Sequence, residues 1–507
     1  MYPIDFFFRA ARRYPDRVAL DGPRGQITYR RLADEVRALA AALQELDPAP
    51  QSRVGICAGN SERHILALLA VLASGKTWVP LNYRSSAPEI ARIVNAVEPT
   101  LLIADEIGAP LLPSTAATRV RLDDTGPGIS LASLLASHAG KSPLRHELPR
   151  DATQAIKFTG GTTGLPKGVM QPYRAWNAGI VNQIACWGLT HEDRYVVAAP
   201  VTHGTGTYLL PVLAQGGTHL LLDGSGPQAV TRAFRERGGT LSFMPPTLIY
   251  MIMAQPGVSR ADFPKLRNLI YGGAPMPREQ IDKARAFFGP VVGTTYGQTE
   301  APQIVTALNP ADMEDPANRG SVGRCTWFSD LAIMAPDGRE LPAGEAGEVV
   351  VRGDLVMSGY WRLREKTEQT LAGGWLHTGD VGLLDERGYL FIKDRLRDVI
   401  ITGGFNVYPV DVENALSSHP AVYESSVFGL PDPKWGEAVH AAVQFHRGMH
   451  AEPEALQAHV RALLGPVQTP KHIHVHASLP RSSVGKVLKN AVRDAAIKET
   501  QDHEQNA

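Results

Sequence analysis

The chain has 507 residues, of which 44% are hydrophobic and 20% charged, and its formal net charge is zero. A single hydrophobic core stops growing at about 250–300 residues, so this length predicts more than one domain. A nucleic-acid partner is not expected, because neutralising phosphates requires an excess of basic residues. No apolar run of about 18 residues occurs, so no transmembrane helix is predicted.

The cysteines and the N-terminus predict a cytoplasmic protein. Cys57, Cys186 and Cys325 are scattered without the spacing of a metal site, and such a sparse, odd set suits a reducing compartment. An acidic residue, Asp5, comes early in the chain, and no basic segment precedes an apolar one. The N-terminus therefore does not resemble a signal peptide.

Apolar strand-like segments alternate with helical patterns along the first half of the chain. We expect helices over 5–22, 30–45, 62–74, 87–97 and 209–214, and strands over 53–58, 78–81, 195–199 and 218–222. This alternation predicts an α/β fold with two layered units and largely parallel sheets. Strand-like segments at 347–352 and 388–392 indicate a small β-rich subdomain, and a compact α+β unit follows residue 397.

The segment FTGGTTGLPKGVM at 158–170 is the most informative part of the chain. Its glycines let backbone N–H groups approach an anion, its threonine hydroxyls donate to phosphate oxygens, and Lys167 supplies positive charge. It does not have the spacing of a Walker A loop. Taken alone, it is either a phosphate-binding loop or a flexible surface loop.

Five further motifs follow this segment. They are YGGAP at 271–275, YGQTE at 296–300, WLHTGD at 375–380, KDR at 393–395 and PRSSVGK at 480–486. In order and spacing, the six motifs resemble those of the acyl-adenylate-forming superfamily, which includes acyl- and aryl-CoA ligases, peptide-synthetase adenylation domains and beetle luciferases. Together they span nearly the whole chain, which makes coincidence negligible.

The resemblance implies a two-domain architecture. The N-terminal domain, 1–396, would combine two layered α/β subdomains with a small distorted β-barrel, and a smaller mobile α+β domain would span 397–507. The domains would rotate about Arg397, two residues after Arg395. The implied small-molecule partners are ATP, Mg²⁺, coenzyme A and a carboxylic acid, and the protein would be a monomer or a homodimer.

The same resemblance assigns the residues around ATP. The phosphates would be held by Thr159, Gly160, Gly161, Thr162, Thr163, Gly164 and Lys167, with Gly160 standing where serine is more common. The adenine would lie beside Gly272, Gly273, Ala274, Pro275, Tyr296, Gly297 and Gln298. Asp380 and Arg395 would hold the ribose hydroxyls, since a carboxylate can accept two hydrogen bonds at once.

Four residues would act on the reacting atoms or on the metal. Thr299 would donate to the α-phosphate, and Glu300 with Thr163 would bind Mg²⁺, a hard cation that prefers oxygen ligands. Lys486 would reach the acyl carboxylate and the α-phosphate, where its charge offsets that of the transition state. Arg481 departs from the usual lysine of this last motif, but the Gly-Lys pair is kept.

Two further sites are less specific. Gly403 and Gly404 would line a channel for the pantetheine thiol, or form a plain turn. His203, beside glycines, would gate the acyl pocket and the approach of the thiol. The predicted substrate-binding residues are His203, Gly204, Thr205, Leu209, Ile270 and Gly293. The His203 segment has no acid that would pair with an α-amine and no arginine that would bind a second carboxylate, so an aryl ring or a medium-to-long acyl chain remains.

The predicted function is an ATP-dependent carboxylic acid:CoA ligase that forms an acyl-adenylate, releases pyrophosphate and then makes the thioester. One alternative is an acyl-AMP ligase that delivers the acyl group to a carrier protein. A non-catalytic binding protein that kept the fold is disfavoured, because Lys486, Glu300 and the glycine-rich loop are all present. Nothing in the sequence specifically supports a luciferase-like oxygenase.

Overall fold

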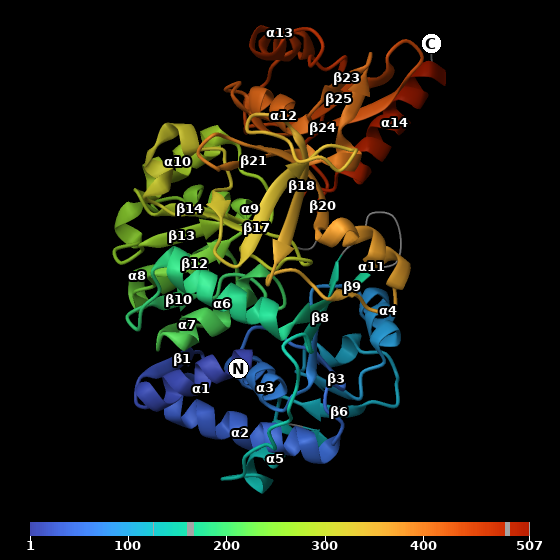
Figure 1. The fold of residues 1–507 in the computed structure, drawn as a ribbon. Coiled ribbons are helices and arrows are strands. Elements are labelled where there is room, and N and C mark those ends of the chain that lie inside the picture. Colours follow the sequence, from blue (N-terminus) through green and yellow to red (C-terminus); the bar gives the residue numbers. More distant parts are fainter. Residues whose placement is uncertain (125, 160–166, 482–486, 506–507) are drawn as a thin grey trace.

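The computed structural model describes residues 1–124, 126–159, 167–481 and 487–505. Figure 1 shows the chain passing from blue N-terminal helices through green and yellow sheets to an orange and red C-terminal unit. None of the helices in these ranges has both the length and the apolar character that crossing a membrane requires.

The first layer is an eight-stranded sheet. Its order is β19 (Gly359–Tyr360), β9 (Lys167–Pro172), β8 (Thr153–Thr159), β4 (Thr77–Leu81), β3 (Arg53–Cys57), β5 (Leu101–Ala104), β6 (Thr118–Arg121) and β7 (Ile129–Ser130). The strands from β8 to β7 are parallel, whereas β9 runs antiparallel to both of its neighbours. Helix α4 (Ala87–Val97) buries its apolar side on one face of this sheet.

The second layer is a nine-stranded sheet. Its order is β16 (Arg324–Cys325), β15 (Thr306–Leu308), β14 (Val292–Tyr296), β13 (Asn268–Tyr271), β12 (Leu241–Met244), β10 (Arg194–Val196), β11 (Thr218–Leu220), β1 (Val18–Gly22) and β2 (Gly25–Thr28). Its outer face is covered by α8 (Gly226–Arg237), α9 (Pro246–Met253) and α10 (Arg278–Phe288).

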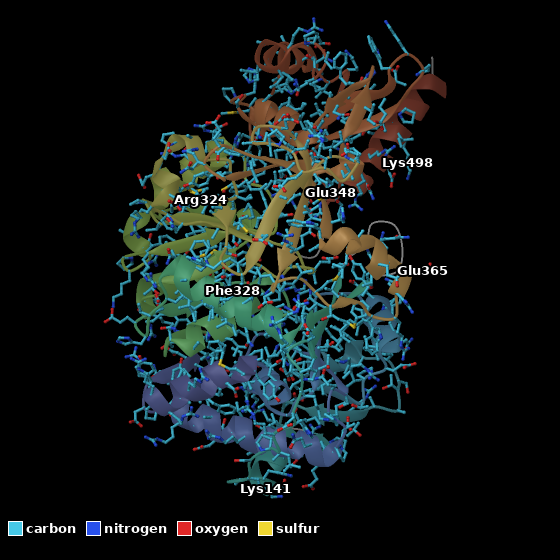
Figure 2. All side chains as sticks on the ribbon, viewed as in Figure 1. Lys141, Arg324, Phe328, Glu348, Glu365 and Lys498 are labelled. Atoms are coloured by element: carbon cyan, nitrogen blue, oxygen red, sulfur yellow. The ribbon has the colours of Figure 1, made fainter. Side chains whose placement is uncertain are left out.

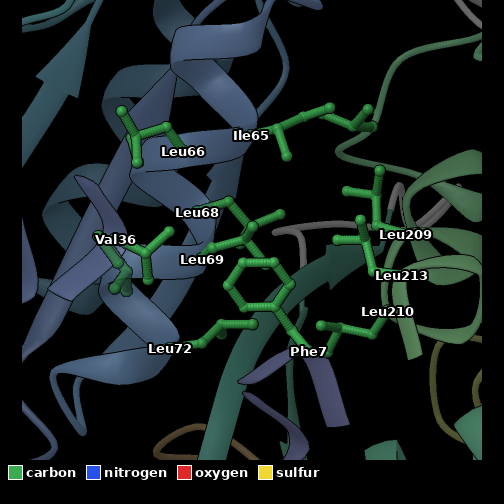
Figure 3. Packing of buried hydrophobic residues seen from close by; sticks show 14 of the residues in the cluster. Phe7, Val36, Ile65, Leu66, Leu68, Leu69, Leu72, Leu209, Leu210 and Leu213 are labelled. Carbon is green, nitrogen blue, oxygen red and sulfur yellow. The ribbon is translucent and has the colours of Figure 1, made fainter. Parts of the chain in front are cut away.

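The largest core lies between the two sheets. It is formed by α1 (Pro3–Arg13), α2 (Tyr29–Leu46), α3 (Glu62–Ala73), α6 (Tyr173–Trp187) and α7 (Leu209–Ala214). Phe7 of α1 is fully buried, and Figure 3 shows it among Leu68, Leu69 and Leu72 of α3 and Leu209, Leu210 and Leu213 of α7. Each such side chain contributes about 1.5–3 kcal/mol when fully buried, so this layer holds the two sheets together.

The third sheet is small and antiparallel. Its four strands run in the order β17 (Ser329–Met334), β18 (Gly347–Gly353), β20 (Leu376–Leu384) and β21 (Leu390–Arg395). Within the described residues the sheet is open, so the expectation of a distorted β-barrel was wrong. The physical reason is strand pairing, because β17 and β21 stand at the two edges of the sheet and, in the part of the chain that the structure describes, do not pair with each other, so the ladder does not close.

The C-terminal unit is α+β, as predicted. Its sheet has the order β23 (Phe405–Val407), β22 (Ile400–Thr402), β25 (Gly436–Phe445) and β24 (Val422–Asp432), with β26 (His472–Val475) beside β25. It carries α12 (Pro409–Ser417), α13 (Pro453–Leu464) and α14 (Lys489–Gln505). Ion pairs cross the expected boundary at 396/397: Lys393 Nζ is 3.1 Å from Asp411 Oδ1, and Lys489 Nζ is 3.4 Å from Asp394 Oδ2.

The first helix is shorter than the sequence pattern suggested. We expected a helix over 5–22, but α1 ends at Arg13 and residues 18–22 form strand β1, which pairs with β11. Pro15 explains the difference, because a proline ring disfavours helical backbone at the residue before it and removes a backbone donor.

His219 of β11 makes the stability of the second layer depend on pH. It is fully buried, lies edge-on to Tyr195, and pairs with the Leu209 carbonyl through Nε2 at 3.0 Å. Burial lowers its pKa from 6.5 to about 4. Its contribution is therefore present above pH 6.5 and is lost as the pH falls toward 4, because the unfolded state then binds the proton more tightly.

We predict that His219→Gln, which cannot take up this proton, makes the free energy of unfolding less dependent on pH between 6.5 and 4. The difference between wild type and variant should reach up to about 3 kcal/mol at the acid end. Urea unfolding followed by tryptophan fluorescence at several pH values measures it. Parallel pH profiles for the two proteins would contradict the assignment.

Candidate active site

The hairpin of β8 and β9 brackets the predicted phosphate loop. Thr159 ends β8, Lys167 begins β9, and the two residues are antiparallel partners. The predicted loop residues Gly160, Gly161, Thr162, Thr163 and Gly164 lie outside the described residues. The structure thus places the two ends of the loop side by side, at the ends of two paired strands of the first sheet.

Tyr360 connects the base of this loop to Glu300. The Lys167 Nζ lies 4.9 Å from the centroid of the Tyr360 ring, and the Tyr360 hydroxyl donates to Glu300 Oε1 at 2.8 Å. Burial, followed by the nearby Glu300 carboxylate, raises the pKa of Tyr360, so its hydroxyl remains a donor. The structure therefore brings together two residues that lie far apart in the sequence and were both predicted to act on phosphate or metal.

The YGQTE segment follows β14 and is fixed to the first sheet. Gln171 of β9 donates its side-chain amide to the Thr299 carbonyl at 2.8 Å, and the Met357 N–H donates to the Glu300 carbonyl at 2.7 Å. Gly297 packs on the backbone of Gln303, whose φ of 68° is unusual for a residue other than glycine. The segment therefore crosses from the second sheet to the first.

Asp380 is a buried carboxylate with donors from two sheets. Its Oδ2 accepts from the Tyr296 hydroxyl and from Gln298 Nε2, both at 2.6 Å, while Arg395 Nε is 2.7 Å from Oδ1. Only 4% of Asp380 is exposed. Burial and the Asp380 charge raise the pKa of Tyr296 far above its usual value. This carboxylate thus brings together three other predicted ATP residues.

Glu348 of β18 supports the turn that presents Asp380. Its Oε1 accepts from the Gly379 N–H at 3.0 Å, and its Oε2 lies 2.8 Å from His377 Nδ1. Glu348 lies on a central strand of the third sheet, and it contacts the WLHTGD segment at both His377 and Gly379.

The predicted adenine residues follow β13. Gly272 comes directly after that strand, and a Cβ there would lie 2.9 Å from the Phe243 ring and 3.0 Å from the Thr295 carbonyl. Gly273, Ala274 and Pro275 continue the segment. Since β13 and β14 are parallel neighbours, their carboxyl ends meet at one edge, where α/β sheets commonly bind ligands.

Several of the predicted acyl residues lie around Phe243 and Trp187. His203 is exposed, and its Nδ1 lies 2.8 Å from Thr202 Oγ1. A Cβ at Gly204 would lie 2.7 Å from Phe243 and 3.0 Å from Gln303 Oε1, and one at Gly293 would lie 3.0 Å from Trp187. The remaining members are buried: Leu209 and Ile270 belong to the same core as these rings, and the Thr205 carbonyl accepts from the Tyr195 hydroxyl.

The predicted hinge and thiol-channel residues lie beyond β21. Arg397 is in a single helical turn, Leu396–Asp398, with Nε 3.6 Å from Asp398 Oδ1. Gly403 and Gly404 form the two-residue turn between β22 and β23, with φ of 58° and 84°, a conformation that favours glycine at both positions. Lys486 lies outside the described residues.

Sequence reasoning missed Tyr360, Gln303, Phe243 and Gln171. Tyr360 is sixty positions from Glu300 and belongs to a two-residue strand, so no local pattern marks it. Phe243 occupies an ordinary apolar strand. Only Gln303 carried a usable signal, because it is a polar residue in the apolar segment that directly follows the YGQTE motif.

Comparison with known proteins identifies the family. The family described as "AMP-binding enzyme" matches residues 7–361, and "AMP-binding enzyme C-terminal domain" matches 411–486. The chain belongs to the AMP-binding enzyme family. A feruloyl-CoA synthase of an Amycolatopsis species is 35% identical, with 96% of this chain and 97% of that one covered.

Two further proteins that resemble this AMP-binding enzyme carry names of different reactions. A fatty acid–[acyl-carrier-protein] ligase of Streptomyces coeruleorubidus is 34% identical, with 92% of this chain and 91% of that one covered. The structure of an amide bond synthetase of Marinactinospora thermotolerans matches with a TM-score of 0.89 at 34% identity, with 97% and 99% covered.

These matches confirm the predicted superfamily, the α/β fold with its smaller C-terminal unit, and the enzyme class, an ATP-dependent, AMP-forming acid:CoA ligase. ATP and CoA are substrates of CoA ligases in this family.

We predict that Asp380→Asn raises the KM for ATP by at least about tenfold. The amide keeps the size of the carboxylate but has one oxygen fewer to accept from Tyr296, Gln298 and Arg395, and a buried polar group left without its partner is costly. Asp330→Asn is the matched control, because Asp330 pairs with Arg352 on the exposed side of the third sheet. Equal KM values for both variants would refute a role of Asp380 in binding ATP.

Proposed function

We propose that the residues gathered at this edge form the adenylating centre, with the roles that follow. The observation that carries the proposal is the convergence of Lys167, Thr299, Glu300 and Asp380, which reach the centre from three different sheets. Adenylation brings two anions together, so it requires fixed donors and positive charge where negative charge develops.

ATP would lie along this edge. Gly272 to Pro275 would flank the adenine, and Asp380 would bind the ribose mainly through Oδ1 and Arg395, because Tyr296 and Gln298 both occupy Oδ2. Residues 159–167 would hold the β- and γ-phosphates. Thr299 would donate to the α-phosphate, where the carboxylate oxygen of the acid forms a bond to phosphorus as the bond to pyrophosphate breaks.

Glu300 fits a Mg²⁺ site. Its Oε1 is held by Tyr360, and Mg²⁺ in nucleotide sites takes one or two carboxylates together with phosphate oxygens and water. The ion would neutralise phosphate charge when bound. Tyr360 would act as a positioning residue, because it fixes the carboxylate without touching the nucleotide.

In the second half-reaction the CoA sulfur would attack the acyl carbon, and the bond from that carbon to AMP would break. The domain that carries Lys486 would rotate about Arg397, and the turn at Gly403 and Gly404 would guide the thiol. In support, the residues beside this turn are exposed and apolar: Phe405 is 62% and Ile401 57% exposed. The name of the feruloyl-CoA synthase supports CoA as the acceptor, whereas the name of the amide bond synthetase supports an amine.

The decisive measurement is pyrophosphate release with Mg-ATP across benzoates, cinnamates, straight-chain fatty acids and malonate, each with and without CoA. We expect release that CoA stimulates, with a thioester product. If CoA does not change the release but an added amine or a carrier protein accelerates it, the amine or the carrier protein is the acceptor. No release with any acid would overturn the proposal.

Lys486→Ala should lower the rate of adenylation by at least about a thousandfold. It should spare thioester formation from pre-made acyl-AMP, because the charge is needed only in the first transition state. The matched control is Lys498→Ala, since Lys498 is exposed on α14 in the same unit (Figure 2). Equal loss of both half-reactions in Lys486→Ala would disprove the division of labour between them.

Glu300→Gln should raise the Mg²⁺ concentration for half-maximal activity by at least about tenfold, because a neutral amide is a poor ligand for a hard cation. Glu365→Gln, at an exposed position of α11 (Arg364–Thr370; Figure 2), is the control. An unchanged Mg²⁺ titration of Glu300→Gln would assign the metal to other residues.

A further inference from the structure

Several buried polar atoms near the predicted acyl residues have no partner among the described residues. They include the Tyr208 hydroxyl, Trp187 Nε1 and Thr205 Oγ1. The three residues are at most 2% exposed. More than nine-tenths of buried polar groups in proteins are hydrogen-bonded, so a cluster of such atoms at one place calls for a ligand that supplies the partners.

The Tyr208 hydroxyl is held in a fixed position. Tyr208 ends the helical turn Gly204–Tyr208, and its ring is stacked between Tyr195 and Phe243, with centroids 5.5 Å away on each side. The ring therefore cannot swing its hydroxyl to the surface. The hydroxyl faces the side chains of Gln303 and Trp187, and burial raises its pKa so far that it stays protonated.

This cluster is joined to the proposed reaction centre by direct packing. Gly204, next to the exposed His203, lies against both Phe243 and Gln303, and Gly293 lies against the Trp187 ring. Gln303 also packs on Gly297 of the YGQTE segment, and its left-handed backbone is the kind of strain that is kept at functional sites. An acid with its carboxylate at Thr299 would direct its far end toward Tyr208.

We propose that the acid activated here is an aromatic acid with an oxygen substituent on the ring, and that Tyr208, Trp187 and Gln303 bind this substituent. The inference rests on the proposed function and names its substrate class. The flat rings of Phe243, beside Gly204, and Trp187, beside Gly293, match an aryl group. A phenol can accept from the indole N–H and exchange a hydrogen bond with the tyrosine, whereas the methyl end of a fatty acid would leave both unpaired.

The test compares kcat/KM for 4-hydroxycinnamate with cinnamate, and for 4-hydroxybenzoate with benzoate, with octanoate as the aliphatic probe. The wild-type enzyme should prefer the hydroxylated member of at least one pair by about tenfold or more, since a site built to bind a hydroxyl rejects the analogue without it. Equal or better turnover of the unsubstituted members, or of octanoate, would overturn the inference.

Tyr208→Phe removes one oxygen and keeps the stacked ring. It should reduce the preference to within about threefold by lowering kcat/KM for the hydroxylated acid alone, and Trp187→Phe should act in the same direction. Tyr195→Phe is the control, because Tyr195 stacks on the other face of Tyr208 and its hydroxyl already donates to the Thr205 carbonyl at 3.2 Å. It should keep the wild-type preference.

The outcomes separate the two proposals. CoA-dependent pyrophosphate release with any acid supports the ligase, and a preference that survives both Tyr208→Phe and Trp187→Phe overturns only the binding of the substituent. Release with straight-chain acids but no aromatic acid also overturns the inference alone. Release with no acid overturns both. If Tyr208→Phe does not fold, the inference is still tested by the kcat/KM ratios of the wild-type enzyme and of Trp187→Phe.

Discussion

The arrangement of the centre depends on one buried charge, the Asp380 carboxylate. A carboxylate this far from water is tolerated only when it is paired and hydrogen-bonded. Tyr296 and Gln298, from the edge of the second sheet, and Arg395, from the third sheet, meet that demand. The third sheet is therefore docked on the second by the group that we propose binds the ribose, so the geometry of the fold and of the nucleotide site cannot vary independently.

The YGQTE segment extends the same constraint to the first sheet. Gln171 and Tyr360, both at that sheet's antiparallel end, fix the Thr299 carbonyl and the Glu300 carboxylate. Five consecutive residues are thus tied to three sheets. Side chains that approach from three directions keep a site ordered and limit the access of water, and both effects strengthen the electrostatic interactions on which adenylation depends.

The sequence predicted those features that depend on local chemistry. The α/β alternation and the motifs are properties of short stretches of sequence, so they could be stated without coordinates. Tyr360 and Gln171 could not be found in this way, because they act across 60 and 128 positions. The open third sheet and the early end of α1 were missed for other reasons: strand pairing is not local, and the helical pattern outweighed the effect of Pro15.

In the proposed centre, described residues on the acyl side and on the ATP side share two neighbours. Phe243 packs against both Gly204, on the acyl side, and Gly272, on the adenine side, and Gln303 likewise joins Gly204 to Gly297. A change of size at either position would move both half-sites, because packed interiors transmit strain. Tyr208 packs on Phe243 and Trp187 lies beside Gly293, so in this proposal both belong to the acyl side. Substrate choice can therefore change there while the adenylating geometry is preserved, which explains how one set of ATP residues can serve acids of different chemistry.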